Sequence, residues 1–484
     1  MNGEGAQAPF LRLLASAVGL VALSWARVLT TGSWAPDHGP FPLLGQWAAA
    51  LAVMALLVNA AHSYRALVRA ARHSPALTRD WLTRALGLAG VAAFMPPLLS
   101  NDLFSVLSYA DLWLNRHVNP LTLASAVPVT PFSVWVSPAW RDAPCVYGPL
   151  QLLWWAPAVG LGVTPGRAVV LANLIALATG ALLLLALYQY CRQRTSGAAR
   201  GFALVAFCPL LWVEGVGQAH NDLLVALLMV LWLLFASRGR TALASFALGA
   251  AVAAKLTAAL LAAGYVVYLV GRALRRRREW HLPLLAAGVM ALTLGALYVP
   301  FWDGGQALAR PLAYLAQRRP SNSLALVVWQ ALRALGMPAE RALATISPVQ
   351  GLLTLAVGCL ALVASLRARS IPALAASMAG SLALLATLGT SVFQPWYLLP
   401  ALVLAADVDG PAWQRWLLLV APLSPLLDGS VLFAPRGTGR AVYTAVTVAV
   451  ACGAWLLWLR PRLGELWATP QAARDETAGL TSTS

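Results

Sequence analysis

The most informative ionisable residue in this chain is Lys255, which interrupts the apolar run VAAKLTAALLAAG. It is the single lysine among 34 Lys and Arg residues. An ionisable group at membrane depth is costly and by default marks a functional site. Because a compact ammonium suits phosphate as a point charge, we expect Lys255 to bind a phosphate group. The alternative is a lysine that snorkels to the nearest interface.

Two carboxylates lie in the segment NDLFSVLSYADLWLNRHVNP. Asp102 is a candidate general base, or it begins a helix together with Asn101 as a capping residue, and the two roles are compatible. Asp111 lies nine residues further on, about half a helical turn out of phase. The two carboxylates therefore do not form a simple pair on one straight helix, and Asp111 remains a candidate for substrate binding.

Basic and aromatic side chains follow in two further loop segments. In VSPAWRDAPCVYGPL, Arg141 binds a phosphate or pairs with Asp142, and Tyr147 is a candidate substrate contact. In QRRPSNS, Arg318 and Arg319 form either a cationic rim for an anionic headgroup or a solvated charged segment. Long loops escape the rule that places arginine inside, so the sequence leaves both interpretations open.

Two short segments between apolar runs carry the remaining candidates. The first segment, WVEGVGQAHNDLL, contains four polar residues: Glu214, His220, Asn221 and Asp222. We expect them to face a ligand; the alternative is a helix start with Asn221 as its cap. The second segment, SVFQPWYLLP, contains Gln394, Trp396 and Tyr397. They are either anchors at the membrane interface or a surface that stacks on a sugar.

The composition places these residues in a polytopic membrane protein. The chain of 484 residues is 60% hydrophobic and 11% charged, and apolar stretches recur along its length. Its net charge of +17 comes largely from arginines in short loops, where positive charge sets membrane orientation. The charge therefore does not indicate a nucleic-acid partner.

The arginine pattern predicts fourteen transmembrane helices with the N-terminus inside. With this count, every short arginine cluster falls on one side. The expected spans are residues 9–30, 42–64, 82–99, 165–190, 200–216, 221–237, 241–254, 256–270, 283–300, 346–366, 371–390, 395–409, 412–428 and 438–459.

Two segments required a choice between alternatives. Residues 149–163 are assigned to a helix in the outer interface, because a span there would move the next arginines outside. Residues 241–270 are assigned to a hairpin with Lys255 at its apex. Each arm would be about 22 Å long, shorter than the roughly 30 Å hydrocarbon core. Irregular backbone at such depth is tolerated where it lines a cavity, so we expect Lys255 in a recessed outer cavity.

The chain is predicted to form one integral membrane domain, residues 1–462. Two long outer loops, about 101–164 and 301–345, contain interfacial helices. Residues 463–484 are polar and short and are predicted to be a disordered cytoplasmic tail.

These motifs, in this order, resemble the polyprenyl-phosphate-sugar-dependent glycosyltransferases of the GT-C fold. The chain is most similar to the polyprenol-phosphomannose-dependent α-1,6-mannosyltransferases of bacterial envelopes. The resemblance covers about residues 80–410 and rests on NDLFSVLSYADLWLNRHVNP, YGP, EGVGQAHNDLL, the hairpin lysine and QPWYLLP. The family often has proline three residues after this lysine, whereas this chain has Ala258.

The resemblance implies a GT-C-like all-α bundle in the bacterial plasma membrane with its active site facing outside. It implies a catalytic aspartate at Asp102, and a lipid phosphate held by Lys255 with Arg318 or Arg319. No cofactor is expected: a compact Asp-X-Asp motif is absent, so we predict no bound metal, although metal dependence is left open.

We therefore expect an enzyme that moves a single sugar, mannose, from a polyprenyl-phosphate donor to a glycan or glycolipid acceptor, with inversion. A polysaccharide polymerase or ligase that uses lipid-linked sugars is one alternative. A transporter of lipid-linked sugars is another; it would favour polar groups at the midplane and an inverted repeat, whereas the polar groups here gather at predicted outer helix ends.

Overall fold

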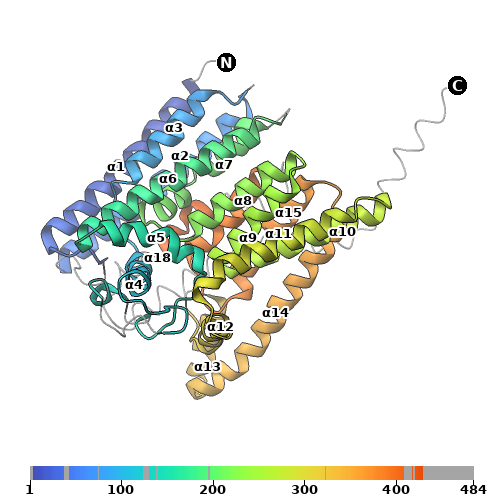
Figure 1. The fold of residues 1–484 in the computed structure, drawn as a ribbon. Helices are drawn as coiled ribbons and strands as arrows, with labels where there is room; N and C mark the ends of the chain where they lie inside the picture. The colour runs from blue at the N-terminus through green and yellow to red at the C-terminus, as the bar shows by residue number, and fades with distance from the viewer. Residues whose placement is uncertain are drawn as a thin grey trace.

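The computed structural model describes residues 4–36, 43–74, 76–123, 130–137, 140–194, 197–321, 323–407, 417 and 420–428. Within these ranges the protein is built from helices, and the one β contact is an isolated bridge between Ser321 and Val392. The long helices run side by side as a bundle, and shorter helices gather at one end (Figure 1). The predicted all-α polytopic fold is therefore confirmed.

The N-terminal part of the bundle consists of helices that pack on one another. These helices are α1 (Glu4–Thr31), α2 (Leu43–Arg72), α3 (Arg79–Ala92), α6 (Pro165–Cys191) and α7 (Ala198–Ala206), followed by a π-helical turn (Leu210–Gly217). The rest of the bundle comprises α8 (Asp222–Ser237), α9 (Thr241–Ala254), α10 (Ala259–Arg276), α11 (His281–Tyr298), α14 (Ala339–Arg367), α15 (Ile371–Leu384) and α16 (Leu399–Leu404).

Seven helices in the described residues are long and apolar enough to cross a membrane. An eighth results if Ala198–Ala206 and Leu210–Gly217, which are bent by 49°, are one span. The predicted count of fourteen depended on shorter segments such as α8 and α9, so it is not confirmed. The predicted span 438–459 lies outside the described residues, as do residues 412–416, 418 and 419 of the predicted span 412–428.

The predicted span 82–99 is wrong in its second half, because α3 already ends at Ala92. Pro96 and Pro97 lack the N–H that a helix needs there. Their irregular backbone is stabilised by side chains: the guanidinium of the buried Arg27 donates to the Pro97 carbonyl at 2.8 Å, and Gln218 Oε1 accepts from two backbone N–H groups, those of Leu98 and Leu99. This segment leads directly into the residues that precede Asp102.

The chain reverses at Lys255, as the sequence predicted. Lys255 has extended backbone angles (φ −155°, ψ 126°) between α9 and a short 3₁₀ turn, Leu256–Ala258. Tyr265 in α10 lies close to Thr241 at the start of α9, so α10 runs back along α9. Ala258 N–H donates to the Lys255 carbonyl at 3.0 Å, a bond that a proline at this position would lack.

The two predicted outer loops contain the short helices α4 (Asp102–Leu114), α5 (Pro149–Leu161), α12 (Gln306–Gln317) and α13 (Leu324–Ala334). The loops contact each other. The rings of Trp113 and Phe301 lie 5.3 Å apart, Asn119 Nδ2 donates to the Phe301 carbonyl at 2.9 Å, and Arg310 Nη1 donates to the Thr122 carbonyl at 2.6 Å. The helix predicted at 149–163 is α5, with 13 residues.

Candidate active site

The carboxylate of Asp102 lies at the first residue of α4, with its side chain 10% exposed. Its Oδ2 accepts a hydrogen bond from the Tyr147 hydroxyl at 2.8 Å and lies 3.5 Å from His220 Nδ1. Burial alone would raise the pKa of Asp102, but the contacts with His220 and Tyr147 outweigh it and the pKa is lowered. The lowered pKa favours the ionised form of the Asp102 carboxyl at neutral pH.

Tyr147 is positioned by the glycine that follows it. Gly148 N–H donates to the Ala254 carbonyl at 3.0 Å, and a Cβ at Gly148 would lie 2.0 Å from the Ala253 carbonyl oxygen. Only glycine permits this approach of two backbones. The first outer loop is thereby fixed against the end of α9, one residue before Lys255.

His220 is buried between two carboxylates and an indole ring. Its Nδ1 faces Asp102, its Nε2 lies 3.2 Å from Glu214 Oε2, and its ring stacks on Trp396 at 3.5 Å with an interplanar angle of 18°. The two nitrogen contacts are ion-pair contacts and do not meet the geometry of a hydrogen bond. Burial would lower the pKa of His220, but the two carboxylates raise it to about 9.

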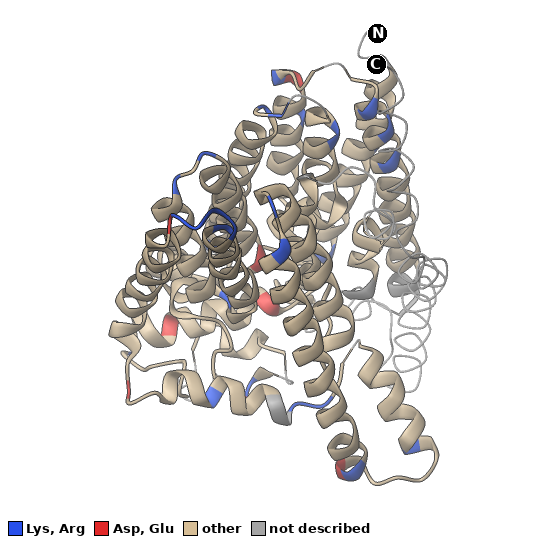
Figure 2. Ribbon diagram, turned by 90° about the vertical axis from the view of Figure 1, so that its right-hand side faces the viewer, with Lys and Arg blue, Asp and Glu red and all other residues tan. Residues whose placement is uncertain are grey.

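Lys255 forms a second buried cation–carboxylate pair. Its Nζ lies 2.7 Å from Asp222 Oδ2 and 4.0 Å from the centre of the Tyr397 ring. Asp222 is the first residue of α8, so this pair joins the start of α8 to the end of α9. Figure 2 shows charged positions inside the bundle as well as at its ends.

Trp396 and Tyr397 each place one ring face against a cationic side chain of the cluster, His220 or Lys255. Both lie in the short 3₁₀ helix Pro395–Leu398. Trp396 covers the imidazole of His220, and Tyr397 covers the ammonium of Lys255. The sequence predicted either interface anchors or sugar stacking; stacking on a sugar stays a prediction for the opposite ring faces.

Asn221 ties α8 to α5. Its side-chain oxygen accepts from Trp155 Nε1 at 3.0 Å, and its backbone carbonyl accepts from Gln151 Nε2 at 2.8 Å. Its side chain makes no capping hydrogen bond, so the capping alternative does not describe it. The contacts fix the turn that carries His220 and Asp222.

Of the two predicted phosphate-binding arginines, Arg318 points toward the cluster. Its guanidinium lies over the Trp140 ring at 3.3 Å, within electrostatic range of Tyr397, and its Nη1 is buried without a hydrogen-bond partner. Arg319 is exposed. The Gln394 side-chain oxygen is also buried without a partner. Arg318 and Gln394 thus carry unused polar atoms that a ligand can satisfy.

Two predicted residues make other contacts. Asp111 accepts from Asn115 Nδ2 at 2.7 Å and lies 3.9 Å from Arg116 Nε, at the far end of α4 from Asp102. Arg141 donates to backbone carbonyls of the first outer loop, at Val134 and Val136. The structure does not bring these two into the charged cluster.

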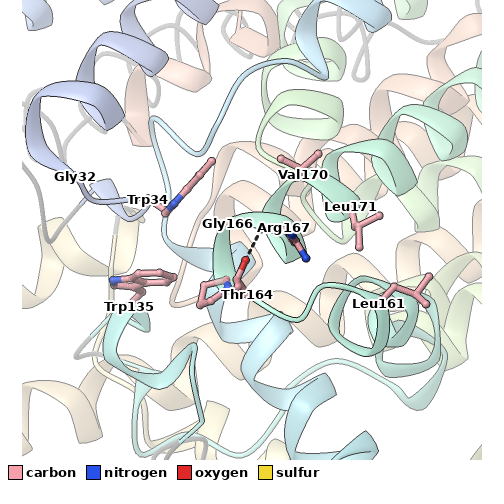
Figure 3. Close-up of a pocket in the computed structure, with 10 residues that line it drawn as sticks. Gly32, Trp34, Trp135, Leu161, Thr164, Gly166, Arg167, Val170 and Leu171 are labelled. Carbon is pink, nitrogen blue, oxygen red and sulfur yellow. Dashed lines mark hydrogen bonds between the residues drawn. The ribbon is translucent and has the colours of Figure 1, made fainter.

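An open pocket adjoins the residue before Asp102. Trp34, Trp135, Thr164 and Arg167 contribute to its lining, and its volume is about 870 Å³ (Figure 3). The Trp135 carbonyl accepts from Asn101 Nδ2 at 3.1 Å. Among the described residues, no group of three His, Cys, Asp or Glu side chains is arranged to hold a metal ion.

The match to a known family decides the class of reaction. The sequence profile of the family described as alpha-(1->6)-mannopyranosyltransferase, N-terminal domain, matches residues 8–272, more than half of the chain. The protein belongs to this mannosyltransferase family. No curated protein sequence matches the chain. The matched range includes Asp102, Tyr147, Glu214, His220 and Lys255, so this mannosyltransferase carries most of its charged cluster within the family domain.

Proposed function

We propose that this mannosyltransferase moves one mannose from a polyprenyl-phosphate donor to a glycan or glycolipid hydroxyl at the outer face of the bacterial plasma membrane. The observation that carries the proposal is the meeting of Asp102 and Lys255. They come from the first outer loop and from a helical hairpin, and they lie within electrostatic range in one largely buried cluster.

Asp102 is the proposed general base. It takes the proton of the acceptor hydroxyl as that oxygen forms a bond to the anomeric carbon of mannose. The bond between the anomeric carbon and the phosphate oxygen breaks at the same time. A positioned base contributes roughly 10² to 10⁴ in rate, and a single displacement inverts the anomeric centre.

Lys255 is the proposed partner of the leaving phosphate. An ammonium has three donors, and in this structure one is used by Asp222 while Tyr397 covers one side. The remaining capacity is available for a phosphate oxygen. Arg318 can add its unpartnered Nη1, and charge stabilisation of this kind acts most strongly in a site shielded from water.

The family name and the proposed displacement together specify the donor. An alpha product formed with inversion requires a β-linked phosphomannose. The decisive experiment gives the purified enzyme in nanodiscs either a β- or an α-linked polyprenyl-phosphate mannose with an octyl α-mannoside acceptor. We expect one α-mannosyl unit added from the β-donor alone. Use of the α-donor, or a β-linked product, would contradict the mechanism.

The same assay separates this function from its alternatives. A polymerase or ligase would transfer chains of sugars from a lipid carrier, which the product mass would reveal. Membership of a mannosyltransferase family favours single-sugar transfer over transport.

A further inference from the structure

Both ring nitrogens of His220 face carboxylates of the protein. Its side chain is 1% exposed, its Nδ1 lies 3.5 Å from Asp102 Oδ2, and its Nε2 lies 3.2 Å from Glu214 Oε2. Trp396 covers one face of the ring. The contacts of His220 are therefore with other protein groups on both edges and one face.

A carboxylate on each nitrogen favours the doubly protonated ring. A neutral imidazole carries one N–H, so one carboxylate would then face a lone pair, whereas the imidazolium presents an N–H to each carboxylate. Glu214 is fully buried, and neither of its oxygens has a hydrogen-bond partner. His220 is the cation within ion-pair distance of Glu214, and burying a carboxylate without such a partner is costly.

We infer that His220 is a positioning residue for Asp102, held as an imidazolium by Glu214, and that it is not a substrate ligand. The inference rests on the proposed role of Asp102 as the base. Both His220 and Tyr147 contact Oδ2 of Asp102, which leaves Oδ1 for the acceptor hydroxyl. Glu214 never touches the substrate; it acts through the charge of His220.

The other charged and titratable groups around the pair do not change this assignment. Asp222 lies close enough to interact electrostatically with His220, but its Oδ2 is paired with Lys255. The hydroxyl of Tyr147 donates to Asp102 and holds the same oxygen in place. Tyr397 lies against Lys255. Asp102 and Glu214 are the carboxylates within ion-pair distance of the imidazole.

The proposal predicts the pH dependence of mannosyl transfer. The rate falls at low pH when Asp102 is protonated, and it falls near pH 9 when His220 loses its second proton, in line with its pKa of about 9. Removing the negative charge of Glu214 lowers the pKa of His220, and removing the positive charge of His220 raises that of Asp102. An opposite charge at this range shifts a pKa by about 1–3 units.

The experiment measures kcat/KM for mannosyl transfer against pH with the full-length enzyme in nanodiscs. We expect Glu214→Gln to move the alkaline limb down by about one pH unit or more. We expect His220→Gln to abolish that limb and to move the acid limb up. Two variants serve as matched controls that leave both limbs in place: Glu279→Gln and His62→Gln, whose side chains lie outside the cluster.

A purely structural role would lower the rate at every pH without moving either limb, and this result would overturn the inference. The wild-type protein provides a test that does not depend on folding of a variant. Of the six histidines, one should show the ¹⁵N signal of a doubly protonated ring above pH 8; its absence would also overturn the inference.

The outcome for Asp102→Asn separates the inference from the proposed function. Full activity of this variant would show that Asp102 is not the base and would reject the proposed mechanism. An inactive Asp102→Asn together with unshifted limbs in the His220 and Glu214 variants would leave the base in place and reject the positioning role.

Discussion

Replacing Lys255 tests the phosphate-binding proposal, and the structure shows that the replacement must be made together with Asp222. Lys255→Met alone removes the ammonium but leaves the Asp222 carboxylate buried, with its side chain 2% exposed. Breaking a buried ion pair by removing one partner costs about 3–5 kcal/mol. The single variant therefore confounds loss of phosphate binding with loss of stability.

The double variant Lys255→Met/Asp222→Asn separates the two effects. It removes both charges and leaves neutral side chains of similar size, so no uncompensated charge stays buried. We expect its thermal stability to lie near that of the wild type and well above that of Lys255→Met. We expect its transfer rate to lie below that of the wild type by a factor on the order of 10² to 10³, the effect of losing one donor to a developing charge.

The assay combines melting curves of purified protein with initial rates of mannosyl transfer from a polyprenyl-phosphate mannose. Asp222→Asn completes the double-mutant cycle, and a coupling free energy well above 0.5 kcal/mol would show that the pair interacts. Near wild-type turnover in the double variant would refute the reasoning, because the leaving phosphate would then not need the ammonium.

Three further experiments test the proposed base, the contact at Gly148 and the orientation in the membrane. Asp102→Asn should slow transfer by about 10² to 10⁴ with donor affinity kept, while Asp111→Asn, whose partner is Asn115, should be milder; equal losses in rate would contradict a special role for Asp102. Gly148→Ala should cost about 1–3 kcal/mol of folding free energy and reduce the rate, because its Cβ would meet the Ala253 carbonyl; unchanged melting and turnover would show that the contact is not needed. In a cysteine-free background, Trp302→Cys should react with an impermeant reagent from outside and Arg238→Cys only from inside; the reverse would overturn the orientation.

The sequence was most informative where one residue conflicts with its surroundings. Lys255 stands out because a charge interrupts an apolar run, and the length of that run predicted the chain reversal that the structure contains. The helical periodicity likewise separated Asp102 from Asp111, and the two make contacts at opposite ends of α4.

Pairings between distant segments could not be predicted in the same way. Trp396 and Tyr397 have the composition of interface anchors, and their contacts with His220 and Lys255 depend on packing across most of the chain. Glu214 faces His220 across a π-helical turn, and no periodicity indicates such a turn. The apolar run 82–99 is long enough to span a membrane, and its length predicted a helix past Pro96 and Pro97, where the structure has none.

The contact between Gly148 and Ala254 has a consequence for biosynthesis. The proposed base Asp102, the tyrosine beside it and the ammonium of Lys255 come together only when a loop that begins at residue 101 rests on a hairpin that ends beyond residue 255. Trp396 and Tyr397, whose rings pack on His220 and Lys255, are synthesised later still. A ribosome-bound chain therefore carries the proposed base long before it carries the rest of the cluster. With the proposed roles, catalytic competence would arrive late in synthesis, after the membrane segments in between have been inserted and packed.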